Sequence, residues 1–291
     1  MNHRLQYKGE TKVYQEVGFD SANDPVPFLK FPLLEKTGVV NHGISTRLGG
    51  VSTGYLSSMN LSYTRGDDPE NVLENYRRMA DAIGVKVEQM VATHQTHTTN
   101  VRLVTREDAG KGVIREKDYT DVDGLMTNVP GICLVTFYAD CVPLFFVDPV
   151  RRVIASSHSG WRGTVGKMGR VTIEKMRETY GCCPEDIYAA IGPSICQDCY
   201  EVSEDVIDQF KQAFPKEVWS RLFYSKENGK YQLDLWKANE QVLLDAGILP
   251  THLTVNNVCT CCNPDLLFSH RASQGKRGNL AAFLALKEEN E

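Results

Sequence analysis

Three short segments carry side chains that can bind a metal ion or attack a substrate. They are residues 93–97 (Thr-His-Gln-Thr-His), 139–143 (Ala-Asp-Cys-Val-Pro) and 157–164 (Ser-His-Ser-Gly-Trp-Arg-Gly-Thr). Each one borders a run that is typical of a β-strand, so we expect it on a loop that regular structure holds in place. Histidine and cysteine in such loops can ligate a metal, act as a general base or act as a nucleophile.

Cys141 and the histidines of these segments allow three interpretations. In the first, Cys141 is a small buried hydrophobic residue and the histidines make structural hydrogen bonds. In the second, Cys141 is a nucleophile and a histidine is its base. In the third, two histidines and Cys141 bind zinc and leave a fourth position for water, whose pKa then falls towards about 7. Spacing leaves the last two open, because the ligands come from separate segments.

Two glycine-containing turns carry an arginine. Residues 160–164 lead into an expected helix, where Gly160 and Gly163 let backbone amides approach an anion and Arg162 adds a fork of donors. Residues 45–50 place Arg47 in a similar turn. Both turns indicate candidate phosphate sites, and the alternative is a solvated arginine in an ordinary turn.

The chain has nine cysteines, and its first 12 residues hold charges but no apolar block. We therefore expect no signal peptide, no disulfide framework and a reducing cytoplasm. Four or five sulfurs could also meet in a structural zinc site, although the Cys-Thr-Cys-Cys run departs from the usual spacing. Buried thiols are the alternative for these cysteines, which are Cys196, Cys199, Cys259, Cys261 and Cys262.

The elements that must position these groups follow from periodicity and turn residues. Strands are expected at residues 39–45, 101–104, 132–137, 144–147, 153–157, 187–191, 253–255 and 266–268. Helices are expected at residues 69–83, 164–180, 203–214, 235–246 and 280–286. Asp68 and Gly84 mark the ends of the first helix, Asn279 caps the last, and the stretch before Pro32 reads as irregular.

Strands and helices mix without a regular βαβ rhythm, which predicts an α+β fold with mixed β-sheets flanked by helices. No break in composition marks a boundary, so we expect a single domain over residues 1–291. A hydrophobic fraction of 42% and a net charge of −5 exclude disorder. They also give no general attraction to nucleic acid or an anionic membrane. The longest uncharged stretch, residues 124–139, is too short for a spanning helix of about 20 residues.

An ordered series of motifs covers most of the chain. It comprises GISTRLGGVS at 43–52, NLS at 60–62, GDDP at 66–69, QTH at 95–97, DVDGL at 121–125, ADCVP at 139–143, HSGWRG at 158–163, IGPSIC at 191–196 and FSHR at 268–271. In this series the chain resembles the bacterial YfiH/YlmD family. That family is related to the human laccase-domain protein and was formerly described as multicopper polyphenol oxidases.

The resemblance implies a zinc-dependent purine nucleoside phosphorylase for adenosine, inosine and methylthioadenosine that also deaminates adenosine. Its partners would be purine nucleosides and phosphate. The matching motifs place the metal ligands at His97, Cys141 and His158, with His97 preferred to His94. Cys141 is also expected to take part in catalysis. The remaining candidate roles are proton carrier for Asp140, phosphate clamps for Arg47 and Arg162, and further substrate contacts for Asn60 and Gly163.

Other classes of function remain open at this point. Cys141 and His158 could form a metal-free hydrolase that edits peptidoglycan precursors, as reported for relatives, or the chain could bind purine nucleotides without turnover. A polyphenol oxidase fits less well, because laccase copper centres need many histidines and the chain has seven. Copper can nevertheless occupy a His/Cys site in vitro. The oligomeric state is open, and a monomer is compatible with the sequence.

Overall fold

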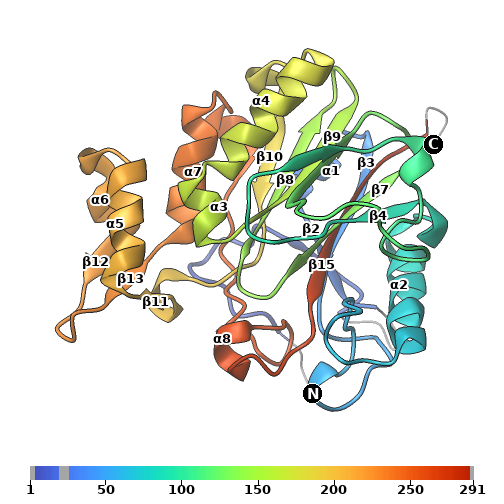
Figure 1. Ribbon diagram of the computed structural model, residues 1–291, viewed down its shortest axis with the longest axis horizontal. Helices are drawn as coiled ribbons and strands as arrows, with labels where there is room; N and C mark the ends of the chain where they lie inside the picture. The colour runs from blue at the N-terminus through green and yellow to red at the C-terminus, as the bar shows by residue number, and fades with distance from the viewer. Residues whose placement is uncertain (1–3, 20–25, 289–291) are drawn as a thin grey trace.

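The computed structural model describes residues 4–19 and 26–288 and contains two six-stranded mixed sheets (Figure 1). The first sheet has the order β1-β2-β3-β15-β7-β4. Its strands are β1 (Gln15–Val17), β2 (Phe28–Lys30), β3 (Val40–Ser45), β15 (Leu280–Leu286), β7 (Cys133–Tyr138) and β4 (Met90–Ala92). Neighbours in this sheet are antiparallel, except for the parallel pair β4 and β7.

The second sheet has the order β14-β10-β8-β9-β6-β5. Its strands are β14 (Leu253–Thr254), β10 (Tyr188–Ile191), β8 (Val142–Asp148), β9 (Val153–Ser159), β6 (Gly124–Thr127) and β5 (Val101–Leu103). The outer pairs of this sheet are parallel and the central ones are antiparallel. β7 and β8 follow each other in the chain but belong to different sheets, so the turn between them joins the two layers.

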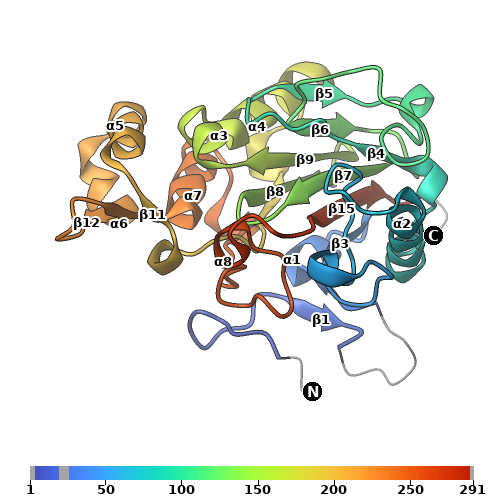
Figure 2. The ribbon, with the colours of Figure 1, turned by 60° about the horizontal axis from the view of Figure 1, so that its bottom comes forward.

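The two sheets pack face to face, and helices cover both outer faces. Alternate residues of β15 point to opposite sides: Leu284 packs in the core between the sheets and Phe283 packs against α2 (Pro69–Ile83). On the other side, α4 (Met168–Tyr180) and α7 (Leu235–Asp245) cover the second sheet (Figure 2). The result is a helix–sheet–sheet–helix arrangement in which the strands β8, β9 and β15 are buried on both faces.

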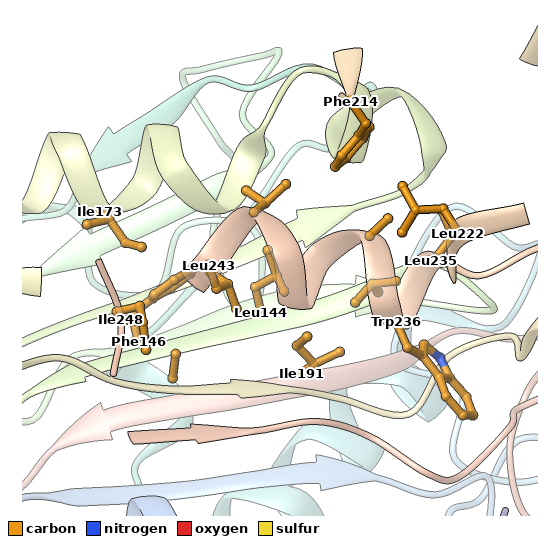
Figure 3. Close-up of a cluster of buried hydrophobic side chains, with 14 of the residues drawn as sticks. Leu144, Phe146, Ile173, Ile191, Phe214, Leu222, Leu235, Trp236, Leu243 and Ile248 are labelled. Atoms are coloured by element: carbon orange, nitrogen blue, oxygen red, sulfur yellow. The ribbon is translucent and has the colours of Figure 1, made fainter. Parts of the chain in front are cut away.

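Figure 3 shows the layer between the second sheet and its helices. Leu144 of β8 and Ile191 of β10 point towards Leu243 of α7 and Ile173 of α4, and all four are buried. Burying a side chain of this size contributes about 1.5–3 kcal/mol. This layer therefore holds the second sheet, whose strands position two of the candidate site residues, against its helices.

The shorter elements lie around these layers. They are α1 (Pro32–Glu35), α3 (Trp161–Val165), α5 (Glu204–Ala213), α6 (Trp219–Leu222), α8 (His270–Ser273) and a three-stranded sheet of β11 (Glu201–Val202), β13 (Tyr231–Leu233) and β12 (Phe223–Ser225). α5, α6 and the small sheet form a lobe beside α7 (Figures 1 and 2). Among the helices of residues 4–19 and 26–288, none combines the length and apolar character needed to cross a membrane.

The predicted α+β class with mixed sheets is confirmed, as is the helix that begins after Asp68 and ends at Gly84. The predicted helix at 164–180 is broken into α3 and α4, because Lys167 adopts a left-handed conformation with φ of 59°. The predicted strand at 266–268 is wrong, since these residues are irregular. The predicted single domain over 1–291 stays a prediction, and both of its ends lie outside the described residues.

The predicted last helix at 280–286 is also wrong, because these residues form β15. Their leucines and alanines favour a helix intrinsically, but pairing with β3 and β7 and burial on both faces override that preference. The stretch before Pro32 was expected to be irregular and instead contains β1 and β2, with residues 1–3 and 20–25 outside the described part.

Candidate active site

The site forms where the chain passes from the first sheet to the second. The turn at Asp140, with φ of 87°, brings Cys141 to the start of β8. Pro143 of β8 pairs with His158 of β9, so the register places His158 beside this turn. His97 comes from the loop between β4 and β5 and has φ of 67°. Three separate segments thus converge at one point.

The structure brings His97, Cys141 and His158 together, and we call them the His–Cys–His group. One nitrogen of each histidine and the sulfur of Cys141 all lie within 4.8 Å of one another. Cys141 Sγ is 3.9 Å from His97 Nε2, and the two imidazole rings have centroids 4.9 Å apart. His158 is buried, whereas His97 is exposed. His94, the other candidate ligand of that loop, is outside this group among the described residues.

Asp123 holds His158 and the loop that carries His97 in place. Its buried carboxylate accepts hydrogen bonds from the backbone amides of Thr96, His97 and Thr98 and from the Thr98 hydroxyl, at 2.9–3.2 Å. It also lies 2.8 Å from His158 Nδ1. This contact leaves His158 Nε2 to act towards Cys141, which is the carboxylate–histidine arrangement found behind metal ligands.

The pKa values of Cys141 and His158 are shifted by their mutual contact. Burial raises the pKa of Cys141, but the charge of His158 and hydrogen bonds from His158 and His97 outweigh it and lower this pKa to about 6. Burial lowers the pKa of His158, but the Cys141 thiolate and Asp123 outweigh that effect and raise it to about 9. Without a metal the pair therefore favours a thiolate beside an imidazolium.

Gly160 and Gln95 also shape the site. A Cβ atom at Gly160 would lie 3.0 Å from Cys141 Sγ and 3.2 Å from His97 Cδ2, so a side chain at this position would press on both residues. Gln95 donates to the carbonyl of Phe137 at 2.8 Å and accepts from its amide at 2.7 Å. This pair holds the loop that carries His97 against the end of β7.

The donor set fits a metal ion. Two imidazole nitrogens and one thiolate suit zinc or copper, and three protein ligands leave a coordination position open for water or substrate. Zinc lies about 2.0–2.3 Å from such ligands, so nitrogen–sulfur separations of about 3.5 Å are needed. The separation of 3.9 Å between Cys141 Sγ and His97 Nε2 is close to that value.

A cavity of about 250 Å³ opens beside the His–Cys–His group, just below the range of about 300–1,000 Å³ for small-molecule sites. Three cationic side chains, those of Arg65, Lys117 and Arg277, line it together with Phe137 and Tyr63. Burial, and then the charge of Arg65, lower the pKa of Arg277 to about 10. Burial also lowers the pKa of Lys117.

The two arginines predicted as phosphate clamps are not among the described residues that line this cavity. Arg47 donates from Nε and Nη2 to the Ser57 carbonyl at 2.9 Å and from Nη1 to the Pro264 carbonyl at 2.6 Å. Its guanidinium thus joins two loops. Arg162 is exposed, with its guanidinium carbon 4.3 Å from the ring centroid of Trp161.

The other predicted site residues, Asp140, Asn60 and Gly163, are also not among the described residues that line the cavity. Asp140 accepts from Thr260 Oγ1 at 2.6 Å and from the Arg271 amide at 2.7 Å. Asn60 is fully buried and accepts from the amide of Asn279, a cavity residue, at 3.1 Å. Gly163 is buried within α3.

Sequence reasoning missed the roles of Asp123, Arg65, Lys117 and Arg277. Asp123 stands in the DVDGL motif at 121–125, but nothing in that motif indicates its contact with His158. The three cations lie far apart in the chain, so no spacing rule connects them.

Comparisons with known proteins show which proteins this chain is similar to. A family model described as multi-copper polyphenol oxidoreductase laccase matches residues 41–287. The purine nucleoside phosphorylase YlmD of Bacillus subtilis is 38% identical over 84% of this chain and 88% of its own length. The adenosine deaminase RL5, from an unknown prokaryotic organism, is 34% identical over 74% of this chain and 82% of its own.

Among solved structures, the Bacillus licheniformis hypothetical protein YfiH superposes with a TM-score of 0.87 at 32% identity, over 95% of this chain and 100% of that one. The match extends through every element that carries the His–Cys–His group. The chain therefore belongs to the laccase-like family of YfiH and YlmD.

Proposed function

We propose that this chain is a zinc-dependent purine nucleoside phosphorylase for adenosine, inosine and methylthioadenosine, with adenosine deaminase activity. The observation that carries the proposal is one cavity that joins the His–Cys–His group to three cationic side chains. The names of the relatives, a purine nucleoside phosphorylase and an adenosine deaminase, support the same two activities.

The cations of the cavity suit phosphate. Among the described residues, Nε of Arg65 and Nε of Arg277 are buried and have no hydrogen-bond partner. The charge of Arg65 helps to lower the pKa of Arg277, and an anion bound between the two guanidinium groups would offset their repulsion. We therefore assign phosphate binding to Arg65 and Arg277, with Lys117 at the cavity wall, in place of Arg47 and Arg162.

The remaining walls suit a nucleoside. Phe137 and Tyr63 offer aromatic surface on which a purine can stack. Asn279 and His94 also line the cavity and supply donors and acceptors for the polar edge of the base or for the ribose. We assign Asn60 and Asp140 to positioning: Asn60 holds Asn279, and Asp140 holds the turn that precedes Cys141.

In phosphorolysis, a phosphate oxygen bonds to C1′ of the ribose while the bond from C1′ to the purine nitrogen breaks. The electron pair leaves with the purine, which takes up a proton. Fixed cations at the phosphate stabilise the charge that redistributes in this transition state. A zinc ion held by the His–Cys–His group would supply a Lewis acid that polarises the purine or, for deamination, activates water.

The test compares two arginines in one assay. Release of free purine from adenosine is measured against phosphate concentration for the wild type, Arg277→Gln and Arg162→Gln. We expect Arg277→Gln to raise the phosphate KM or lower the rate by about 10–100-fold, the loss of a charge-assisted hydrogen bond, and to reduce deamination less. A loss confined to Arg162→Gln would return the phosphate site to the turn of α3.

A metal-free hydrolase is the second candidate, favoured by the lowered pKa of Cys141 and the raised pKa of His158. A thiolate beside an imidazolium is the resting state of a cysteine nucleophile. Peptidoglycan precursors are the substrate class for this alternative. Turnover of such a precursor by chelator-treated, metal-free protein would support it, and loss of all activity on chelation with recovery on adding zinc would exclude it.

A further inference from the structure

Four cysteine side chains gather outside the cavity, and we call them the four-cysteine cluster. The Sγ atoms of Cys196, Cys199, Cys259 and Cys262 all lie within 4.8 Å of one another, and those of Cys199 and Cys262 are 3.5 Å apart. Cys196 and Cys259 are buried, and the other two are half-buried. We propose that this cluster binds one structural zinc ion through four thiolates, as a second metal site separate from the His–Cys–His group.

The four cysteines of the cluster form two pairs with the same sequence spacing. Cys196 and Cys199 form one C-x-x-C pair, and Cys259 and Cys262 form another. Cys261, which made the second half look irregular in the sequence, is outside the cluster. Two C-x-x-C pairs are the arrangement of four-cysteine structural zinc sites, because each short turn points two sulfurs to the same side.

The separations between the sulfurs fit a single ion. A tetrahedral zinc site with zinc–sulfur distances of about 2.3 Å places its sulfurs about 3.8 Å apart. The spread of up to 4.8 Å, with one pair at 3.5 Å, needs only small side-chain movements to reach that geometry. A four-iron cluster would hold the sulfurs wider apart, because the cluster itself occupies the space between them.

The backbone holds the two turns in register. Ser194 and Cys259 form a parallel β-bridge, and the Thr260 amide donates to the Ser194 carbonyl at 3.2 Å. The Cys196 amide donates to Cys259 Sγ at 3.2 Å. A bond from an amide to sulfur stabilises a thiolate, so it supports a ligand of a metal better than a buried thiol.

Cations lie beside the cluster. Lys8 pairs with Asp198, inside the first turn, at 3.0 Å and lies within electrostatic reach of Cys196 and Cys262. Arg271 donates to the Cys199 carbonyl at 3.0 Å. Four thiolates around a divalent ion carry a net charge of −2; Arg271 offsets part of it, and Lys8 shares its charge between the cluster and Asp198.

The position of the cluster explains what the ion would stabilise. Residues 255–269 contain no helix or strand, although Val258 and Phe268 are buried in the core, so an ion bound by Cys259 and Cys262 would cross-link this irregular segment to the turn of Cys196 and Cys199. Both turns also contact Asp140: Thr260 Oγ1 donates to its carboxylate, and the Ile195 amide donates to its carbonyl at 3.0 Å. The second ion would therefore brace the turn that presents Cys141.

The test counts zinc in the full chain, purified without added metal, after the first site has been removed. In a His97→Ala/His158→Ala background, elemental analysis should find about one zinc per chain. Adding Cys199→Ser and Cys262→Ser should remove it. The matched controls Cys261→Ser and Cys183→Ser, in the same background, should keep it.

A second measurement covers the case in which the serine variants do not fold. Wild-type protein is loaded with cobalt(II), whose visible absorption distinguishes a site with four sulfurs from a site with one. Strong charge-transfer bands from four thiolates support the proposal, whereas bands from a single thiolate overturn it. Iron in place of zinc, a disulfide within the cluster detected by intact mass, or metal-free protein with four titratable thiols would each overturn it as well.

Discussion

Replacing Asp123 by asparagine removes the negative charge that binds both His158 and the loop of His97. Asp123 accepts five hydrogen bonds, from three amides, one hydroxyl and His158. Asparagine presents an NH₂ group in place of one oxygen, so at least two of these donors would face another donor. A hydrogen bond to a charged acceptor contributes about 1.5–3 kcal/mol, which gives a loss of about 3–6 kcal/mol in the free energy of unfolding. Loss of the partner of His158 should also weaken metal affinity by about 10–100-fold.

Both effects are measured on the same protein. Urea unfolding of the metal-free form gives the loss of stability, and competition with a chromophoric chelator gives the zinc affinity. The control is Asp121→Asn, because Asp121 accepts hydrogen bonds from the Thr96 hydroxyl and Asn100 but touches no histidine of the group. An Asp123→Asn variant with unchanged zinc affinity would refute the role of Asp123 behind His158, even if its stability fell.

Three further predictions concern other parts of the molecule. Burial raises the pKa of Asp108, but Lys111 and other donors outweigh it and lower this pKa to about 2, so the carboxylate stabilises the folded state by about 2 kcal/mol above pH 4. That contribution is lost as the pH falls from about 4 to 2. Urea unfolding of Asp108→Asn should therefore show a lower free energy of unfolding at pH 7 and a flatter dependence on pH between 4 and 2. A free energy of unfolding that matches the wild type at every pH would contradict this prediction. Gly160→Ala should reduce zinc affinity at least tenfold, because its Cβ would press on Cys141 Sγ. Equal zinc affinity of variant and wild type in chelator competition would show that Cys141 and His97 can move aside. Phe283→Ala, in the fully buried layer between β15 and α2, should cost about 3–5 kcal/mol by urea unfolding, and a loss below 1 kcal/mol would contradict this packing.

Local signals in the sequence were enough to predict several elements. Asp68 before Pro69 and Gly84 after an amphipathic stretch bound α2 as expected, since a cap and a left-handed glycine act within one turn of the helix. The run from Leu280 to Leu286 shows the limit. Its residues favour a helix, and only its partners β3 and β7, which lie far away in the chain, make it a strand.

Some residues of the candidate site could likewise be predicted from local motifs, whereas others depend on the fold. The ordered motifs pointed to His97, Cys141 and His158, which the structure brings together. Arg277 carries no local signal, because its place in the cavity depends on how the loop before β15 crosses the site. The spacing Cys-Thr-Cys-Cys was misleading for a similar reason, since the folded structure, and not the local sequence, determines that Cys259 and Cys262, without Cys261, lie beside Cys196 and Cys199.

The place of β15 between β3 and β7 has a consequence for how the chain is made. During synthesis β3 and β7 emerge long before β15, and each must present an unpaired edge until residues 280–286 leave the ribosome. The first sheet cannot close during translation, so its assembly is a late step with many contacts distant in sequence, which slows folding. Exposed edges in that interval invite pairing with other nascent chains. Rapid synthesis of this protein would thus increase the chance that these edges pair wrongly before β15 is available.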